Sequence, residues 1–335
     1  MHVGDLMYQE VPDIAPGRIL DLPLSTLKSL RRSVFKDVIA KAKAGKHLII
    51  NTHATFRWKH GLLPAVDFEQ LAELDADIYI NLIDNVDLQH IRMTQEHEVH
   101  HSLKDLLVWR EEEILATQML RDGCQLQRSK NKPVSTFYQL ALGEDNATAK
   151  MFYRLMYQQQ LPKAYIGFPM SHVQDMPEVL NDIKQFADDI SEHMIVFDPK
   201  DLEEMVLHIR AIEASKKGER SIEVCALNEV VRFDVSEIIQ VAGDIHSQIY
   251  ARDFMLIDHA DMIISYVPEM ENGKPAISSG VERELQHAHE MAKEVYVIWR
   301  PQCVPSPFIT NTATEVFKDV SEAIDYFKEC GHIAT

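Results

Sequence analysis

The stretch Arg252–Arg300, RDFMLIDHADMIISYVPEMENGKPAISSGVERELQHAHEMAKEVYVIWR, decides the fold of this chain. Its two almost wholly apolar runs, Met262–Val267 and Val295–Trp299, are typical of strands that are buried on both faces of a parallel sheet. The segment between them, Ser279–Ala292, has apolar residues at helical spacing. Strand, helix and strand in this order predict one unit of a parallel α/β sheet.

The same alternation continues along the rest of the chain. The second half is predicted to contain strands at Lys163–Phe168 and Met194–Phe197 and helices at Met176–Ile190 and Asp319–Phe327. The first half is predicted to contain helices at Ser25–Ala44, Phe68–Leu74 and Ser102–Leu120, strands at His47–Asn51 and Asp77–Ile83, and a short strand at Gln125–Arg128. A helix over Ala147–Gln160 is expected between the two halves.

This pattern predicts an α/β protein of two domains. Each domain is expected to have a mostly parallel sheet flanked by helices, and the C-terminal sheet is expected to be doubly wound and flavodoxin-like. A chain of 335 residues is long enough for two domains. Polar residues near Lys130 and a break at Gly143–Asn146 divide the chain into a first domain (1–135), a connecting helix and linker (136–162) and a second domain (163–335).

The composition excludes several classes of partner. The chain has 52 acidic and 34 basic residues, so its formal charge is −18. A protein this acidic repels phosphate backbones and anionic membranes, and neither is expected as a partner. Four cysteines without a CxxC motif indicate a reducing compartment and no metal site. Without a signal peptide or a membrane-spanning run, the cytoplasm is the expected location.

Two carboxylates in the second half stand where a parallel sheet would bring them together. Asp253 is expected on a loop before the Met262–Val267 strand, and Glu284 near the start of the following helix. Tyr165 and Gly167 end another predicted strand. Ligands of open parallel sheets bind outside the carboxyl ends of the strands. These residues are therefore expected to line one cleft.

The second half resembles the nucleoside 2-deoxyribosyltransferase family, which includes deoxynucleoside-monophosphate N-glycosidases. The matching pattern is Tyr165-Ile166-Gly167, then Asp253, then Ala260-Asp261, then Gly280-x-x-x-Glu284 with Ala288. The resemblance implies that Glu284 is the nucleophile, Asp253 the general acid and Tyr165 the residue that positions the nucleophile. Gly167, Ser278, Ser279 and Gly280 would contact the substrate. A homo-oligomer is expected, with Asn311 reaching a neighbour's site.

The residues by themselves leave several readings open. Asp258 could replace Asp253 as the acid, and Asp261 is expected to be structural. Ser278 favours a 5′-phosphorylated substrate within the resembling family, although a serine before a helix is also an ordinary N-cap. Glu284 should be ionised at neutral pH unless burial raises its pKa, because free glutamate has a pKa of about 4.3.

The first half resembles archaeal-type adenylate kinases. The similar segments are Gly4–Met7 (GDLM), Ile49–Phe56 (IINTHATF), Gly61–Pro64 (GLLP) and Asp75–Asp84 (DADIYINLID). The phosphate-binding motif GxxxxGK[ST] occurs nowhere in the sequence, so phosphoryl transfer is not expected. This half is either a degenerate nucleotide-binding or dimerising module, or a domain whose first segment lies upstream of the given sequence.

The sequence thus predicts cleavage of the N-glycosidic bond of a deoxynucleoside or its 5′-monophosphate through a covalent glycosyl-Glu284 intermediate. The partner is a small nucleoside or nucleotide, and no metal or redox cofactor is implied. Two alternatives stay open: a glycohydrolase for NAD-like substrates, and a nucleotide sensor that binds without turnover. Base preference, and water or a second base as acceptor, are not determined.

Overall fold

The computed structural model describes residues 1–45, 47–58, 61–97, 100–142, 146–173, 176–201, 204–226 and 229–334. The fold is α/β, as predicted. Its contacts divide the chain into two compact units. Unit 1 comprises Met1–Leu140 and Glu203–His246, and unit 2 comprises Ala141–Leu202 and Ser247–Thr335.

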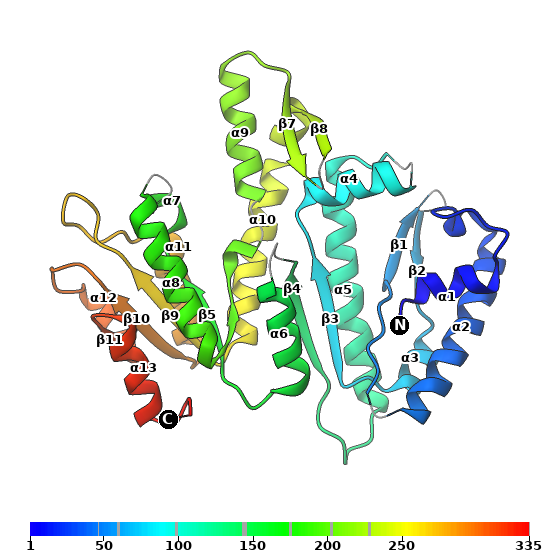
Figure 1. Cartoon of the computed structure of the whole chain (residues 1–335), viewed down its shortest axis with the longest axis horizontal. Helices are drawn as coiled ribbons and strands as arrows, with labels where there is room; N and C mark the ends of the chain where they lie inside the picture. Colours follow the sequence, from blue (N-terminus) through cyan, green and yellow to red (C-terminus); the bar gives the residue numbers. More distant parts are fainter. Residues whose placement is uncertain are drawn as a thin grey trace. The chain divides into compact units, whose positions relative to one another are not determined.

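Unit 2 is built on a five-stranded parallel sheet (Figure 1). The strand order is β11-β10-β9-β5-β6, and every neighbouring pair is parallel. In the register of the two central strands, Tyr165 lies opposite Ile263 and Gly167 opposite Ser265. The strands are β5 (Lys163–Gly167), β6 (Ile195–Phe197), β9 (Met262–Val267), β10 (Glu294–Trp299) and β11 (Glu315–Phe317).

Helices cover both faces of this sheet. On one face, α8 and α13 pack on alternate strand residues such as Ile166 and Ile264, through Phe186 and Phe327. The end of α10 and the buried side of α11 cover the opposite face, toward which Tyr165 points. The helices of unit 2 are α6 (Asn146–Tyr157), α7 (Met170–Val173), α8 (Pro177–His193), α11 (Ser279–Glu290), α12 (Pro307–Thr310), α13 (Val320–Glu329) and the C-terminal part of α10 (Val235–His259).

The path of the chain changes direction between β5 and β9. From β5 the chain proceeds to β6 on one side of that strand, and it returns to β9 on the other side. The connections therefore diverge at the carboxyl ends of β5 and β9, which is where ligands of such sheets bind. Gly167 and Ser265 lie at this edge.

Unit 1 contains short sheets around a helical core. The described residues of this unit form three two-stranded sheets, and the β1–β2 and β7–β8 pairs are antiparallel. The strands are β1 (Thr55–Trp58), β2 (Gly61–Pro64), β3 (Ile78–Ile83), β4 (Thr136–Ala141), β7 (Ser221–Ala226) and β8 (Glu229–Asp234). The helices are α1 (Val3–Glu10), α2 (Leu24–Ala44), α3 (Phe68–Leu74), α4 (Val86–His97), α5 (Leu103–Gln127), α9 (Glu204–Lys216) and the start of α10. There is a short 3-10 helix in each unit: η1 (Ile19–Asp21) in unit 1 and η2 (Pro199–Asp201) in unit 2.

Several predictions for unit 1 are wrong. Two of its three described sheets, β1–β2 and β7–β8, are antiparallel instead of parallel. His47–Asn51 makes only one isolated bridge, between Asn51 and His2, because its apolar side chains pack beside α1 and α2 instead of joining a sheet. Gln125–Arg128 is no strand: α5 continues to Gln127, and the Arg128 guanidinium binds Asp75 and the Pro133 carbonyl.

The segment Glu204–His246 packs with unit 1, whereas the predicted domains placed it in 163–335. A buried ion pair explains this placement. Arg110 Nη2 lies 2.6 Å from Glu204 Oε1, and the two side chains are 4% and 1% exposed. The same oxygen accepts a 2.8 Å hydrogen bond from the Val86 amide. The compact units therefore run differently from the predicted domains.

Candidate active site

Glu284 lies against the carboxyl end of β5. Ser278 caps α11 by accepting a hydrogen bond from the Val281 amide, and Glu284 follows in the second turn of this helix. A methyl group on Gly167 would meet Glu284 Oε2 at 3.1 Å and Ser265 Oγ at 3.1 Å. Glycine at position 167 therefore allows the carboxyl group to reach the sheet edge.

Tyr165 and Glu284 present buried polar atoms to each other. Tyr165 is fully buried in β5. Its Oη and Glu284 Oε2 are both inaccessible, and neither has a hydrogen-bond partner among the described residues. Their polar contact lowers the pKa of Glu284 but falls short of hydrogen-bond geometry. Buried polar atoms normally have partners, so this pair indicates a place built for a ligand or a reaction.

The environment raises the pKa of Glu284 to about 8. Burial is the largest cause, and repulsion by Asp253 adds to it. Burial thus supplies the condition under which Glu284 was expected not to be ionised at neutral pH, and a pKa of about 8 favours the protonated form at pH 7. A carboxyl group that titrates near neutrality in a crevice is typical of acid–base and nucleophilic sites.

Asp253 is close enough to Glu284 for their charges to interact. It lies in the helix α10, not on the predicted loop, because the helix continues to His259 with Leu256 and Ile257 buried. Arg252 Nε and Nη2 donate to Asp253 Oδ1 at 3.0 and 2.9 Å. Burial nevertheless raises the pKa of Asp253, and Arg252 acts in the opposite direction.

A third carboxyl group, Asp198, was not predicted. It follows β6 directly, and its Oδ1 accepts a 2.8 Å hydrogen bond from the Lys200 amide. Burial raises the pKa of Asp198, and the charges of Arg252 and Asp253 also act on it. The signal was available: an aspartate immediately after the strand predicted at Met194–Phe197 stands at the carboxyl edge of the sheet. We call Tyr165, Asp198, Arg252, Asp253 and Glu284 the carboxyl cluster.

The other predicted contact residues lie at different distances from this cluster. A methyl group on Gly280 would come within 4.0 Å of Glu284 Oε1, whereas Ser279 is exposed at the start of α11. The Ser278 hydroxyl is occupied as the helix cap. Asn311 is exposed at the end of α12, and no described contact joins it to the carboxyl cluster.

The two alternative aspartates have other partners. Asp258 Oδ1 lies 2.8 Å from His287 Nε2 on the outer side of α10 and α11. Asp261 accepts a 2.8 Å hydrogen bond from the Lys163 amide and joins the starts of β5 and β9, so the prediction that it is structural is confirmed. Asp253 is therefore the aspartate that faces Glu284.

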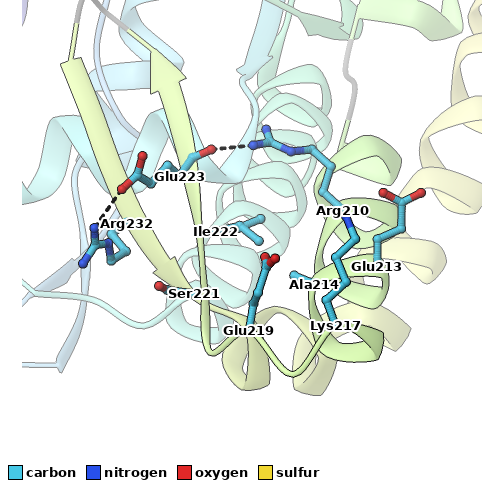
Figure 2. Close-up of a pocket in the computed structure, with 9 residues that line it drawn as sticks. All are labelled: Arg210, Glu213, Ala214, Lys217, Glu219, Ser221, Ile222, Glu223 and Arg232. Carbon is cyan, nitrogen blue, oxygen red and sulfur yellow. Dashed lines mark hydrogen bonds and ion pairs between the residues drawn. The ribbon is translucent and has the colours of Figure 1, made fainter.

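A surface pocket in unit 1 contains none of the predicted residues. It lies between α9 and the β7–β8 hairpin and has a volume of about 410 Å³ (Figure 2). Arg210 donates to the Glu223 carbonyl, and Arg232 pairs with the Glu223 carboxylate at 2.8 Å. The lining has three cations (Arg210, Lys217, Arg232) and three carboxylates (Glu213, Glu219, Glu223). These balanced, solvated charges give the pocket no catalytic character.

Neither a metal site nor a similar protein points to a function. Within the described ranges, no three His, Cys, Asp or Glu residues are arranged to hold a metal ion, and no helix is long and apolar enough to cross a membrane. The four cysteines are free thiols. No family model matches the chain, and a search of curated proteins found no similar sequence. Both family resemblances stay hypotheses.

Proposed function

We propose that unit 2 cleaves the N-glycosidic bond of a deoxynucleoside or a deoxynucleoside 5′-monophosphate. One observation carries the proposal: the Glu284 carboxyl group lies at the carboxyl end of β5, beside Gly167, with Tyr165 and Asp253 within electrostatic reach. Two carboxyl groups near the anomeric carbon of a sugar are the usual apparatus of glycosyl transfer.

The strand order supports a ligand at this edge. Counted along the chain within unit 2, the sheet order is 2-1-3-4-5, which is that of doubly wound, flavodoxin-like sheets. In such sheets the ligand binds at the point where the order reverses. That point lies between β5 and β9, where Gly167 and Ser265 face each other.

The proposed reaction has two steps. Asp253 gives its proton to the base, the bond between C1′ and the base nitrogen breaks with its electron pair going to the base, and a Glu284 carboxylate oxygen forms a bond to C1′. Water or a second base then attacks C1′, gives its proton to Asp253, and frees Glu284. Protonation of the leaving base contributes about 10²–10⁴-fold.

Glu284 must lose its proton before it can attack. With a pKa of about 8, only a minor fraction of the free protein is ionised at pH 7. The reactive form has an ionised Glu284 and one proton left for the leaving base. The rate of base release at low substrate concentration should therefore be low at both ends of the pH range, which gives a bell-shaped profile.

The remaining parts of the proposal concern substrate and assembly. The N-terminus of α11, which Ser278 caps, would attract a 5′-phosphate. We propose a cytoplasmic homo-oligomer in which Asn311 serves a neighbouring subunit. Unit 1, with its similarity to kinases but no phosphate-binding motif, would bind a nucleotide or hold subunits together.

The test is release of free base from a panel of deoxynucleosides, their 5′-monophosphates and NAD. Glu284→Gln should reduce release by about 10³-fold or more, as expected for loss of a nucleophile. Glu282→Gln is the matched control, because Glu282 is exposed two residues away on another side of α11. Full base release by Glu284→Gln would exclude the mechanism.

The panel also separates the alternatives. Release of nicotinamide from NAD alone would indicate an NAD-type glycohydrolase. Binding of nucleotides with no release of base, under conditions where the chain is folded, would indicate a sensor. Mass spectrometry of the protein trapped with a 2′-fluorinated deoxynucleoside analogue should detect a covalent adduct on Glu284, and an adduct elsewhere would contradict the assignment.

A further inference from the structure

The carboxyl cluster contains one arginine for three carboxyl groups. Asp198, Asp253 and Glu284 come from the end of β6, from α10 and from α11, and Tyr165 faces them from β5. Arg252 is the cation of this cluster, and the charge of Lys200 also acts on Asp198. Three buried carboxylates cannot all be ionised beside one guanidinium, so the cluster retains protons near neutral pH.

Arg252 forms hydrogen bonds with Asp253 but not with Glu284. Its Nε and Nη2 both bind Oδ1 of Asp253, and Nη2 also donates to the Pro199 carbonyl at 3.1 Å. The Pro199 contact ties the guanidinium to the loop after β6. Among the described residues, no hydrogen bond reaches Asp253 Oδ2 or Glu284 Oε2. Asp253 thus has a fixed cationic partner, and Glu284 has none.

We propose that Arg252 is a positioning residue that decides where the cluster keeps its protons and which oxygen of Asp253 faces the substrate. By binding Oδ1, it leaves Oδ2 as the oxygen that carries and delivers the proton. By favouring an ionised Asp253, it places the resting proton on Glu284. The inference rests on the function proposed above, because that reaction gives these two groups opposite roles.

This arrangement has a mechanistic consequence. The resting protein holds a proton on Glu284 and an ionised Asp253, whereas the reaction needs the reverse. Tyr165 interacts electrostatically with both groups, and its hydroxyl has no hydrogen-bond partner among the described residues. These carboxyl groups interact, so each one's ionisation changes the pKa of the others. The rising and falling limbs of the pH profile therefore report on the cluster as a whole and not on single residues.

Two substitutions test the role of Arg252. In Arg252→Met the positive charge is lost, so every carboxyl group holds its proton more tightly and both limbs of the pH profile of kcat/KM for base release should move to higher pH. Arg252→Lys retains the charge without the two-donor contact. It should keep the limbs near those of the wild type but lower kcat by about 10–100-fold through poorer orientation of Asp253.

The matched control is Arg154→Met. Arg154 lies in the same unit, and its guanidinium donates to the backbone carbonyls of Ser191, Glu192 and Met194. Its loss removes an equal charge and should leave both limbs in place. A shift of the limbs in Arg154→Met as large as in Arg252→Met would overturn the proposal, and so would unchanged limbs in active Arg252→Met.

A second measurement does not depend on turnover. Carbon-13 NMR of the wild-type protein with labelled Asp and Glu carboxyls, assigned through Asp253→Asn and Glu284→Gln, follows each group through pH. The proposal expects Asp253 to ionise at lower pH than Glu284. The opposite order would refute it even if base release is observed, whereas the expected order without base release would separate a correct charge arrangement from a wrong function.

Discussion

Two buried arginines of this protein, Arg110 in unit 1 and Arg252 in unit 2, have opposite surroundings. Arg110 forms a two-pronged ion pair with Glu204, and the Val86 amide also binds that carboxylate. Arg252 binds Asp253 and its charge acts on Asp198, and one arginine cannot neutralise the three carboxyl groups of the cluster. The first arrangement is balanced and holds α5, α9 and the start of α4 together. The second is unbalanced, which costs stability and gives a carboxyl group that titrates near neutral pH.

The largest expected difference in stability comes from breaking the balanced pair. Glu204→Gln leaves Arg110 buried beside a neutral amide and should lower the free energy of unfolding of unit 1 by about 3–5 kcal/mol. Hydrogen exchange read peptide by peptide should show faster exchange in α5 and α9. The control is Glu213→Gln, an exposed residue of α9. Equal stability of the two variants would show that the pair contributes nothing.

The unbalanced cluster should respond to pH in a defined direction. Because the folded pKa of Glu284 is about 8 and its ordinary value is 4.5, the folded protein binds the proton more tightly than the unfolded chain does. The contribution of Glu284 to the free energy of unfolding of unit 2 is then fully present below about pH 4.5. It is lost as pH rises through 8, which lowers the free energy of unfolding by roughly 2–4 kcal/mol. Denaturation of unit 2 measured between pH 5 and 9 should show this decline, and Glu284→Gln should remove most of it. A pH-independent wild type would contradict the burial of this carboxyl group.

Gly167→Ala changes the packing of the carboxyl cluster without changing its charge. The added methyl would meet Glu284 Oε2 and Ser265 Oγ at 3.1 Å, so the carboxyl group must shift. We expect a loss of about 1–3 kcal/mol in stability from overpacking and about 10²-fold in base release from the misplaced nucleophile. Gly243→Ala, at a helical position with nothing within 4 Å, should show neither effect. Unaltered activity in Gly167→Ala would mean that this contact does not position Glu284.

The smallest effect is expected at the helix cap. Ser278→Ala removes the hydrogen bond to the Val281 amide and should destabilise α11 by about 1 kcal/mol. Ser306→Ala is the control, because Ser306 is an N-cap whose side chain makes no capping bond. Ser278→Asp keeps a cap but adds a negative charge, so it should weaken turnover of monophosphates more than that of nucleosides. An equal effect on both substrates would remove the argument for a 5′-phosphate.

Local patterns predicted most of unit 2. The apolar runs at β9 and β10 and the periodic helices α8 and α11 were placed within a few residues, because a strand buried on both faces and an amphipathic helix each leave a regular mark in sequence. The same approach failed in unit 1. The hairpin at Ser221–Asp234 was missed, and His47–Asn51 was taken for a strand although its apolar residues only contact neighbouring helices.

For the candidate site, the sequence by itself determined the residue types at the sheet edge: Tyr165 and Gly167 at a strand end, Asp253 ahead of a strand, and Glu284 in the following helix. Only the tertiary structure decided that Glu284 is buried and protonated, that Asp253 lies in a helix against Arg252, and that Asp198 joins them. Hydrophobic periodicity depends on neighbours a few residues apart. The charge state of a carboxyl group depends on groups brought within a few ångströms from distant segments, and no local pattern records that proximity.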